Sequence, residues 1–214
     1  MRQENVGIPE ELLTRVRDRK KATRQEVTIE FTRKSIHLLI AFVPFLLTLS
    51  RPMTIVLLAA GTVLYIVFET LRMQGIHIPL ISVLTAQAAR LRDDGRFIMG
   101  PVTLGLGALL SILIFQPLPA SIAIYILAFG DSFSSLVGKT LGRIPMPFTS
   151  GKSVEGSLTC FTASLISAYA LSRRLGTSLA IAAVSTFVEA IPAKDWDNIL
   201  LPLAAGFTAT ILGL

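Results

Sequence analysis

The sequence predicts an all-α, polytopic integral membrane protein with about seven transmembrane helices and its N-terminus in the cytoplasm. Of its 214 residues, 52% are hydrophobic and only 16% are charged, and the mean hydropathy is +0.65. Soluble domains average about 25% charged residues, because each needs a polar outer layer. The apolar residues stand in long blocks, and most Lys and Arg residues gather in alternate connections between these blocks.

Seven apolar blocks are the candidate membrane spans. A helix needs about 20 mostly apolar residues to cross the hydrocarbon core. The blocks are residues 35–50, 53–71, 98–116, 118–138, 154–172, 177–192 and 198–214. The first block is short, and we expect residues 31–34 to extend it to the interface. Two prolines within residues 116–119 predict a tight hairpin turn between the third and fourth blocks.

Small residues inside the blocks predict close helix packing. Gly105 and Gly107 in the third block, and Gly156, Cys160 and Ser164 in the fifth, have the size that lets membrane helices approach one another. Cys160 is the single cysteine, so an internal disulfide framework and a thiolate metal cluster are excluded. We interpret it as a small residue of the helix interior.

The distribution of Lys and Arg sets the expected orientation. Seventeen of the 20 lie in the leader and in the second, fourth and sixth connections, and three lie in the first, third and fifth. Because cytoplasmic loops carry the excess of Lys and Arg, we expect a cytoplasmic N-terminus and, for an odd number of spans, an external C-terminus. The net charge of +6 then faces anionic lipid and cytosolic anions, and nucleic acid is not needed as a partner to explain it.

We divide the chain into a basic cytoplasmic or interfacial leader, residues 1–29, and a transmembrane domain, residues 30–214. The leader is too long and too charged for a cleaved signal peptide. It suits a basic amphipathic helix on the membrane surface and a solvated tail equally well. The connection 72–97 is mildly amphipathic, and we expect it to lie along the interface, where it could form a lipid entrance.

The first polar cluster stands where the first span begins. Ionisable residues at or inside span ends are functional candidates, because burying them in a membrane is costly. Glu30, Arg33, Lys34 and His37 follow i, i+3, i+4, i+7 spacing and so share one helical face. Such a face suits phosphate binding or polarisation of a hydroxyl. A cytoplasmic anchor with an internal Glu30–Lys34 pair explains the cations alone at least as well.

The fourth block ends in a polar stripe of Asp131, Ser134, Ser135 and Gly138, followed by Lys139. A single buried carboxylate is costly unless it meets a cation. Oxygen-lined sites suit Mg²⁺, which takes one or two carboxylates together with substrate phosphates. The alternative is a carboxylate paired with a lysine for packing.

Residues 151–157, Gly-Lys-Ser-Val-Glu-Gly-Ser, open the fifth block. A Walker A loop needs a glycine five positions before its Gly-Lys pair, but Met146 and Phe133 occupy those positions, so this is not a P-loop. We expect Ser153 to cap the helix, whose N–H groups and dipole then hold phosphate while Lys152 supplies charge. The alternative is an ordinary capped helix with Lys152 among the lipid headgroups.

The sixth connection brings further acidic and amide groups to the same membrane face. They are Glu189, Asp195, Asp197 and Asn198. Asp195 and Asp197 alone suit a solvated loop, whereas Glu189 lies near the end of a span. Together, these clusters predict a cytoplasm-facing site for a metal and phosphates at the edge of the bilayer, where a water-soluble nucleotide can meet a lipid hydroxyl.

These residues resemble the CTP-dependent lipid-alcohol kinases, a family that includes dolichol kinase, phytol and farnesol kinases and a CTP-dependent diacylglycerol kinase. The family motifs are Glu-x-x-Arg-Lys-x-x-His, Gly-Asp-x-x-Ala/Ser-x-x-x-Gly-Lys, Lys-Ser-x-Glu-Gly-Ser, and Glu-x-x-Pro followed by Asp-Asn. They stand here in chain order as Glu30, Arg33, Lys34 and His37; Gly130, Asp131, Ser134, Gly138 and Lys139; Lys152, Ser153, Glu155, Gly156 and Ser157; and Glu189, Pro192, Asp197 and Asn198. The resemblance covers most of residues 30–206.

The resemblance implies a phosphotransferase in the cell (inner) membrane with its site facing the cytoplasm. It would transfer the γ-phosphate of CTP, with Mg²⁺ or a similar divalent ion, to the hydroxyl of a polyprenol, a phytol-like alcohol or diacylglycerol. Phosphatidate cytidylyltransferases share two of the segments but continue with Pro-Gly-His-Gly-Gly and Asp-Arg, which do not follow Asn198 here. A small-molecule transporter is a further alternative, but it should carry its charges at mid-bilayer in an inverted repeat.

The resemblance also implies roles for individual residues. The expected metal ligands are Asp131, Asp197 and Glu155. The expected nucleotide-binding residues are Arg33, Lys34, His37, Lys139, Lys152, Ser153, Gly156 and Asn198. The expected catalytic set is Asp131, Lys152, Glu155 and Glu189, with either Glu189 or Asp131 accepting the proton of the lipid hydroxyl. The identity of the alcohol, the general base and the oligomeric state stay open.

Overall fold

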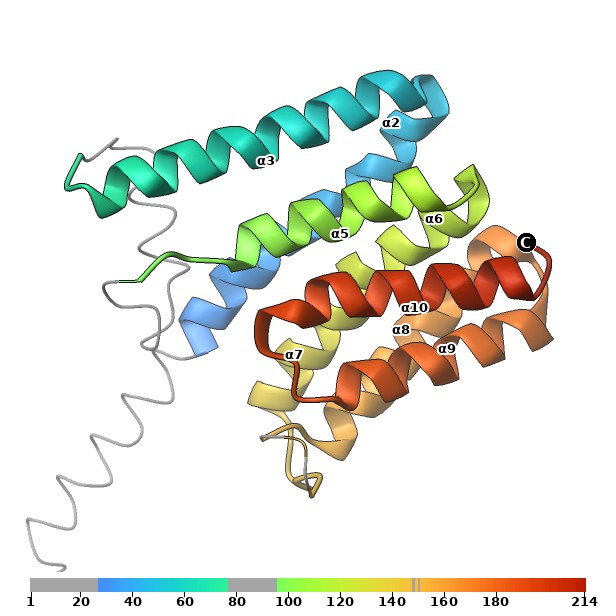
Figure 1. The fold of residues 1–214 in the computed structure, drawn as a ribbon. Helices are drawn as coiled ribbons and strands as arrows, with labels where there is room; N and C mark the ends of the chain where they lie inside the picture. Colours follow the sequence, from blue (N-terminus) through green and yellow to red (C-terminus); the bar gives the residue numbers. More distant parts are fainter. Residues whose placement is uncertain (1–26, 77–95, 148, 150) are drawn as a thin grey trace, which may run out of the picture.

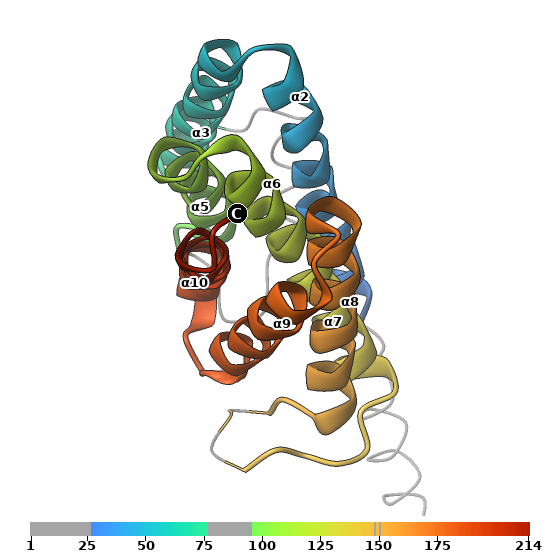
Figure 2. The same ribbon diagram turned by 90° about the vertical axis from the view of Figure 1, so that its right-hand side faces the viewer.

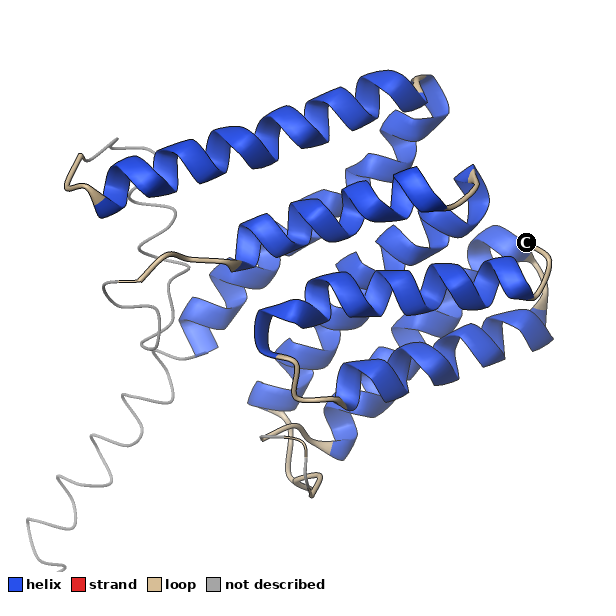
Figure 3. Cartoon of the chain, in the orientation of Figure 1, coloured by secondary structure: helices blue, strands red, loops and turns tan. Residues whose placement is uncertain are grey.

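The computed structural model describes residues 27–76, 96–147, 149 and 151–214. These residues are almost entirely helical (Figure 3). In this part of the chain no residue belongs to a named strand, and Pro145 and Ser153 form an isolated antiparallel bridge. The all-α prediction is therefore confirmed for the described residues.

Each of the expected apolar blocks coincides with a helical stretch. Residues 27–38 form the first described part of the first helix. The elements that follow are η1 (Leu39–Phe42), α2 (Val43–Leu49), α3 (Arg51–Met73), α5 (Gly100–Ile114), α6 (Pro117–Tyr125), the π-turn η3 (Ile126–Gly130), α7 (Asp131–Thr140), α8 (Val154–Ser172), α9 (Leu175–Ala190), η4 (Lys194–Trp196) and α10 (Asp197–Ile211).

Several of these helices are suited to a membrane. Within the described residues, four are long and apolar enough to cross it: Val27–Leu49, Arg51–Met73, Pro117–Thr140 and Val154–Ser172. Two more apolar helices, Gly100–Ile114 and Leu175–Ala190, are shorter. The chain is a membrane protein, whereas the number of seven spans and the cytoplasmic N-terminus stay predictions.

The helices form two layers, and the helix Pro117–Thr140, which we call the central helix, contacts both of them. Figure 2 shows α3, α5 and α10 stacked in one layer, and the first helix, α6 and α8 in the other, with α9 joining them. The helix Pro117–Thr140 contributes to both apolar clusters of the core: Ile124 and Leu127 pack toward the first helix and α5, and Ile122 and Ile126 toward α8, α9 and α10. Asp131 thus sits on a helix that packs against both apolar clusters and is the most buried of the four long apolar helices in the described part of the chain.

Small residues stand where helices pack closely, as the sequence predicts. A Cβ atom on Gly107 of α5 would lie 2.0 Å from the carbonyl oxygen of Asn198 in α10. A Cβ atom on Gly156 of α8 would lie 2.9 Å from the carbonyl oxygen of Ser134 in α7. No larger residue fits either contact without moving backbone, so glycine brings the polar ends of these helices together.

The turn between the third and fourth blocks differs from the prediction. The extended residues Phe115 and Gln116 make the turn, and Pro117 already opens α6. Proline suits the first position of a helix, because the N–H that it lacks has no partner there. The prolines thus start the central helix rather than separate two helices.

Two expectations fall mostly outside the described residues. The surface helix expected in the leader 1–29 lies there apart from residues 27–29, and so does the interfacial path of connection 72–97 apart from residues 72–76 and 96–97. At the edge of that connection, Arg72 Nη2 lies 2.7 Å from Glu69 Oε1, and the Ile98 N–H donates to the same oxygen at 2.8 Å. This buried carboxylate therefore fastens the segment before α5 to the end of α3.

Candidate functional site

Helix ends from distant parts of the chain meet at one end of the bundle. They are the start of the first helix, the last turns of α7, the start of α8, the end of α9 and the start of α10 (Figure 1). They surround a cavity of about 570 Å³, a volume typical of ligand pockets. Its polar lining consists of Glu30, Arg33, Ser134, Ser135, Lys139, Thr149, Lys152, Ser153, Ser157, Glu189, Lys194 and Asp197.

Two lysines of the cavity are paired with carboxylates from other elements. Lys139 Nζ of α7 lies 2.6 Å from Glu30 Oε2 of the first helix, and Lys152 Nζ lies 2.8 Å from Glu189 Oε1 at the end of α9. Arg33 also binds Glu30. The Lys139–Glu30 and Lys152–Glu189 pairs each join two elements across the cavity, whereas Arg33 and Glu30 lie on the same helix. An anion that enters can therefore compete with a carboxylate for a cation already in place.

The start of α8 presents its backbone N–H groups at the cavity. Ser153 caps the helix as predicted: its Oγ accepts from the Gly156 N–H at 3.1 Å. The first N–H groups of a helix and its dipole favour an anion at this end. Ser153, Gly156 and Lys152 all line the cavity, so the capped helix start and the lysine charge face the same space.

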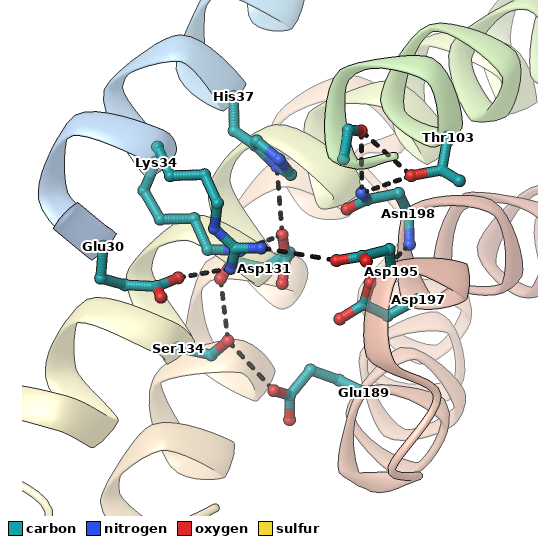
Figure 4. A network of polar contacts seen from close by, with 12 residues as sticks. Glu30, Lys34, His37, Thr103, Asp131, Ser134, Glu189, Asp195, Asp197 and Asn198 are labelled. Atoms are coloured by element: carbon teal, nitrogen blue, oxygen red, sulfur yellow. Dashed lines mark hydrogen bonds and ion pairs between the residues drawn. The ribbon is translucent and has the colours of Figure 1, made fainter. Parts of the chain in front are cut away.

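Asp131 lies beneath the cavity in a buried charged cluster. Its Oδ2 accepts a hydrogen bond from Lys34 Nζ and lies 3.3 Å from His37 Nδ1 (Figure 4). All three residues are buried, and none of them lines the cavity. The structure therefore places Lys34 and His37, which the sequence suggested for nucleotide binding, against Asp131. Asp131 meets the cation that a buried carboxylate needs.

Glu189 and Asp197 supply the carboxylates on the far wall of the cavity. Glu189 is 5% exposed, and its Oε1 also accepts from the Ser134 hydroxyl at 3.3 Å. Its Oε2 is buried and has no hydrogen-bond partner in the described part of the chain. Burial, together with the negative charge of Asp131, raises the pKa of Asp197 to about 6. Glu189 therefore keeps one oxygen that is unpaired within the described residues, beside its ion pair with Lys152, whereas the charge of Asp197 is disfavoured by burial, which a bound cation would offset.

Two other candidates make structural contacts instead. Asn198 is buried, and its Nδ2 donates to Thr103 Oγ1 of α5 at 2.9 Å (Figure 4). Glu155 Oε1 accepts from the N–H groups of Arg143 and Ile144 at 3.0 and 3.3 Å, which holds the loop before α8. Neither residue lines the cavity.

Some contacts at the site were missed from the sequence. Helical spacing offered Lys34 as a partner of Glu30 in the alternative interpretation, and the structure shows Glu30 in contact with Arg33 and with Lys139, 109 positions away. Ser134 was part of a stripe without a partner, yet it bridges the Asp131 carbonyl and Glu189. Helical spacing predicts which residues share a face, but it does not say which helix that face meets.

The residues that line the cavity can hold a divalent ion only if a bound ligand supplies further oxygen atoms. Within the described residues no group of three or more His, Cys, Asp or Glu side chains is placed to hold a metal ion. Mg²⁺ commonly takes one or two protein carboxylates and completes its shell with phosphates and water. The carboxylate of Asp197, which lines the cavity, fits that arrangement, whereas Asp131 already binds Lys34.

The chain is similar in sequence to curated plant proteins. It is 28% identical over 156 residues to a probable chloroplastic phytol kinase 1 of Oryza sativa subsp. japonica, covering 64% of this chain and 50% of the relative. It is 32% identical over 131 residues to a probable chloroplastic phytol kinase of Triticum aestivum, covering 53% and 44%. For a probable chloroplastic phytol kinase 2 of Glycine max the identity is 30% over 131 residues, covering 53% and 45%.

These similarities confirm the resemblance to lipid-alcohol kinases that the motifs indicated. The chain spans about half the length of the curated relatives it matches. No protein-family model matches the chain, and no solved structure matches it significantly.

Proposed function

We propose that this protein is a CTP-dependent kinase that transfers the γ-phosphate of the nucleotide to the hydroxyl of a membrane lipid alcohol. The observation that carries the proposal is the cavity where Lys152, the capped start of α8 and the carboxylate of Glu189 face one another. Similarity to probable phytol kinases supports the acceptor class. Use of CTP follows from the motif resemblance alone and is part of the proposal.

The cationic groups hold the phosphates. Phosphoryl transfer depends on positioning and on stabilising the charge of the transferred group. Lys139, Lys152 and Arg33 approach the cavity from three elements, and the N–H groups at the start of α8 add a fourth source of positive potential. Phosphate oxygens exchange places with the carboxylates of Glu30 and Glu189 at these cations.

Asp197 is the residue that would hold a divalent cation brought with the nucleotide. When bound, such an ion supplies positive charge that neutralises the phosphate oxygens. Asp131 has a positioning role: through Lys34 and His37 it fixes the first helix, and with it Glu30 and Arg33, against α7.

Glu189 accepts the proton of the alcohol. Once the phosphates draw Lys152 away, the buried carboxylate of Glu189 loses its cation and becomes a stronger base. The alcohol oxygen forms a bond to the γ-phosphorus, the bond from that phosphorus to the β,γ-bridging oxygen breaks, and the hydroxyl proton passes to Glu189. The products are the lipid phosphate and CDP.

We place the protein in the cell (inner) membrane with this cavity on the cytoplasmic side, where CTP is available. The excess of Lys and Arg in the leader and in the connections at this end of the helices supports that orientation.

The test uses the purified full chain in lipid nanodiscs with Mg²⁺, mixed lipid alcohols and CTP labelled at the α- or the γ-phosphate. Label from the γ-position in the lipid is the expected result. Label from the α-position would identify a cytidylyltransferase. If neither label reached the lipid, the transporter would remain as the alternative. Parallel reactions with ATP, GTP and UTP test the choice of nucleotide.

A further inference from the structure

A second cavity, which we call the apolar groove, lies on the helices that carry the polar cavity. It measures about 590 Å³ and is formed by the central helix on one side and by α8 on the other. The first wall consists of the rings of Tyr125, Phe129 and Phe133, and the second consists of α8 side chains that include Thr159 and Ala163.

The aromatic wall is a stacked ladder. The ring centroids of Tyr125 and Phe129 are 5.7 Å apart with an interplanar angle of 8°, and those of Phe129 and Phe133 are 5.9 Å apart at 21°. Since Tyr125 and Phe133 are eight positions apart, the ladder extends about 12 Å along the helix. Phe133 is 40% exposed, so the protein leaves the end of the ladder nearest the site open.

The apolar groove begins at the level where the polar cavity ends. Ser134, which follows Phe133 on α7, lines the polar cavity, and Ser157 of α8 lines it two positions before Thr159. From there the groove runs along both helices away from the site, as far as Tyr125 on the central helix. A molecule with one polar end and one apolar chain matches a polar cavity that is followed by an apolar groove.

We propose that the apolar groove binds the hydrocarbon chain of the acceptor alcohol. The inference rests on the proposed kinase function. The groove offers apolar surface, which a chain covers favourably and a soluble ligand does not. The small side chains opposite the rings, such as Ala163, leave width for a chain between the two helices.

The direct test is photolabelling of the full chain in nanodiscs with a phytol-like alcohol that carries a diazirine near the end of its chain. We expect label on α8 and on the aromatic ladder, and we expect excess unlabelled phytol-like alcohol to remove it. Label that excess alcohol does not remove would mean that bilayer lipid fills the groove, and would overturn the proposal.

A kinetic test shows whether the groove contributes to binding of the alcohol. In Ala163→Phe we expect the KM for the alcohol to rise about tenfold or more, because the new ring occupies the space of the chain, while the KM for CTP stays unchanged. The matched control is Ala183→Phe, which places the same ring on an exposed position of α9 outside both cavities. If Ala163→Phe fails to fold, photolabelling of the unmodified protein still decides.

The two proposals fail in different ways. Photolabelling needs no nucleotide, so competed label in the groove without phosphate transfer would contradict the kinase and leave the chain-binding site standing. Phosphate transfer together with competed label on other helices would contradict the groove alone.

Discussion

Lys152 Nζ lies 2.8 Å from Glu189 Oε1, so a residue before α8 and a residue near the end of α9 form an ion pair at the wall of the cavity. The side chain of Lys152 is 25% exposed and that of Glu189 is 7% exposed. The lysine can therefore turn toward an entering phosphate, while the carboxylate stays buried. In the proposed kinase this pair couples nucleotide binding to the basicity of Glu189.

Replacing Lys152 should impair transfer far more than folding. We expect Lys152→Ala to lower kcat by about 10²–10³, as for the loss of a group that stabilises charge in the transition state, and Lys152→Arg to recover part of the loss. The measurement is phosphate transfer at saturating alcohol. Arg143→Ala, which removes an exposed cation from the same loop, is the control and should stay within about twofold. Equal losses of kcat in both variants would mean that Lys152 acts only through the total positive charge of the loop.

Glu189→Gln tests the proton acceptor. The amide keeps the shape of the side chain but cannot take a proton, so we expect kcat to fall by about 10²–10⁴ while CTP binding, measured directly with labelled nucleotide, is retained. Glu69→Gln is the matched control, because it is the same change in a buried carboxylate that pairs with Arg72 and does not line the cavity. Near-normal turnover in Glu189→Gln would remove Glu189 from the mechanism.

The buried pair of Asp131 and Lys34 should dominate the stability of the site end of the bundle. Asp131→Asn leaves Lys34 charged and unpaired at 1% exposure, and breaking a buried pair in this way costs about 3–5 kcal/mol. We expect a lowered melting temperature in detergent, and recovery of most of it when Lys34→Met is added to the same chain.

The double variant also tests the positioning role of Asp131. With stability restored but the first helix no longer fixed to α7 through position 131, we expect the KM for CTP to stay raised about tenfold, because Arg33 on the first helix loses its fixed place. If the double variant regains both stability and the normal KM, Asp131 serves stability alone.

The helices were predictable because span length and apolar composition dictate them. The block 154–172 matches α8 (Val154–Ser172), whose Ser153 cap was visible as a serine before an apolar run. The π-turn Ile126–Gly130 was not predictable, because one widened turn leaves no mark in a uniformly apolar sequence. It directly precedes Asp131 and so sets the direction in which that carboxylate points.

At the site, sequence patterns located the segments but not the orientation of each side chain. Asp197 and Asn198 are neighbours in one motif, yet successive residues of a helix point about 100° apart. Asp197 therefore lines the cavity, while Asn198 faces Thr103 of α5. Only the packing of α10 against α5 decides which of the two faces the ligand, and that packing depends on Gly107, far away in the sequence.

Gly107 should tolerate no side chain. In Gly107→Ala the new methyl group would meet the backbone carbonyl of Asn198 at 2.0 Å, so α5 and α10 must separate. We expect a loss of about 1–3 kcal/mol, the usual cost of overpacking, seen as a lower melting temperature. Gly61→Ala on α3, where nothing lies within 4 Å, should be neutral or stabilising, since alanine favours a helix by about 0.5–1 kcal/mol.

The expected orientation can be measured because Cys160 is buried and gives little background with thiol reagents. Arg143 lies at the site end of the bundle, in the loop before α8, and Arg174 lies at the opposite end of that helix; both are exposed. If the cavity faces the cytoplasm, an impermeant maleimide added to whole cells should label Arg174→Cys, and should label Arg143→Cys only after the membrane is opened. The reverse pattern would put the cavity outside, away from cytosolic CTP, and the proposed phosphate donor would then be untenable.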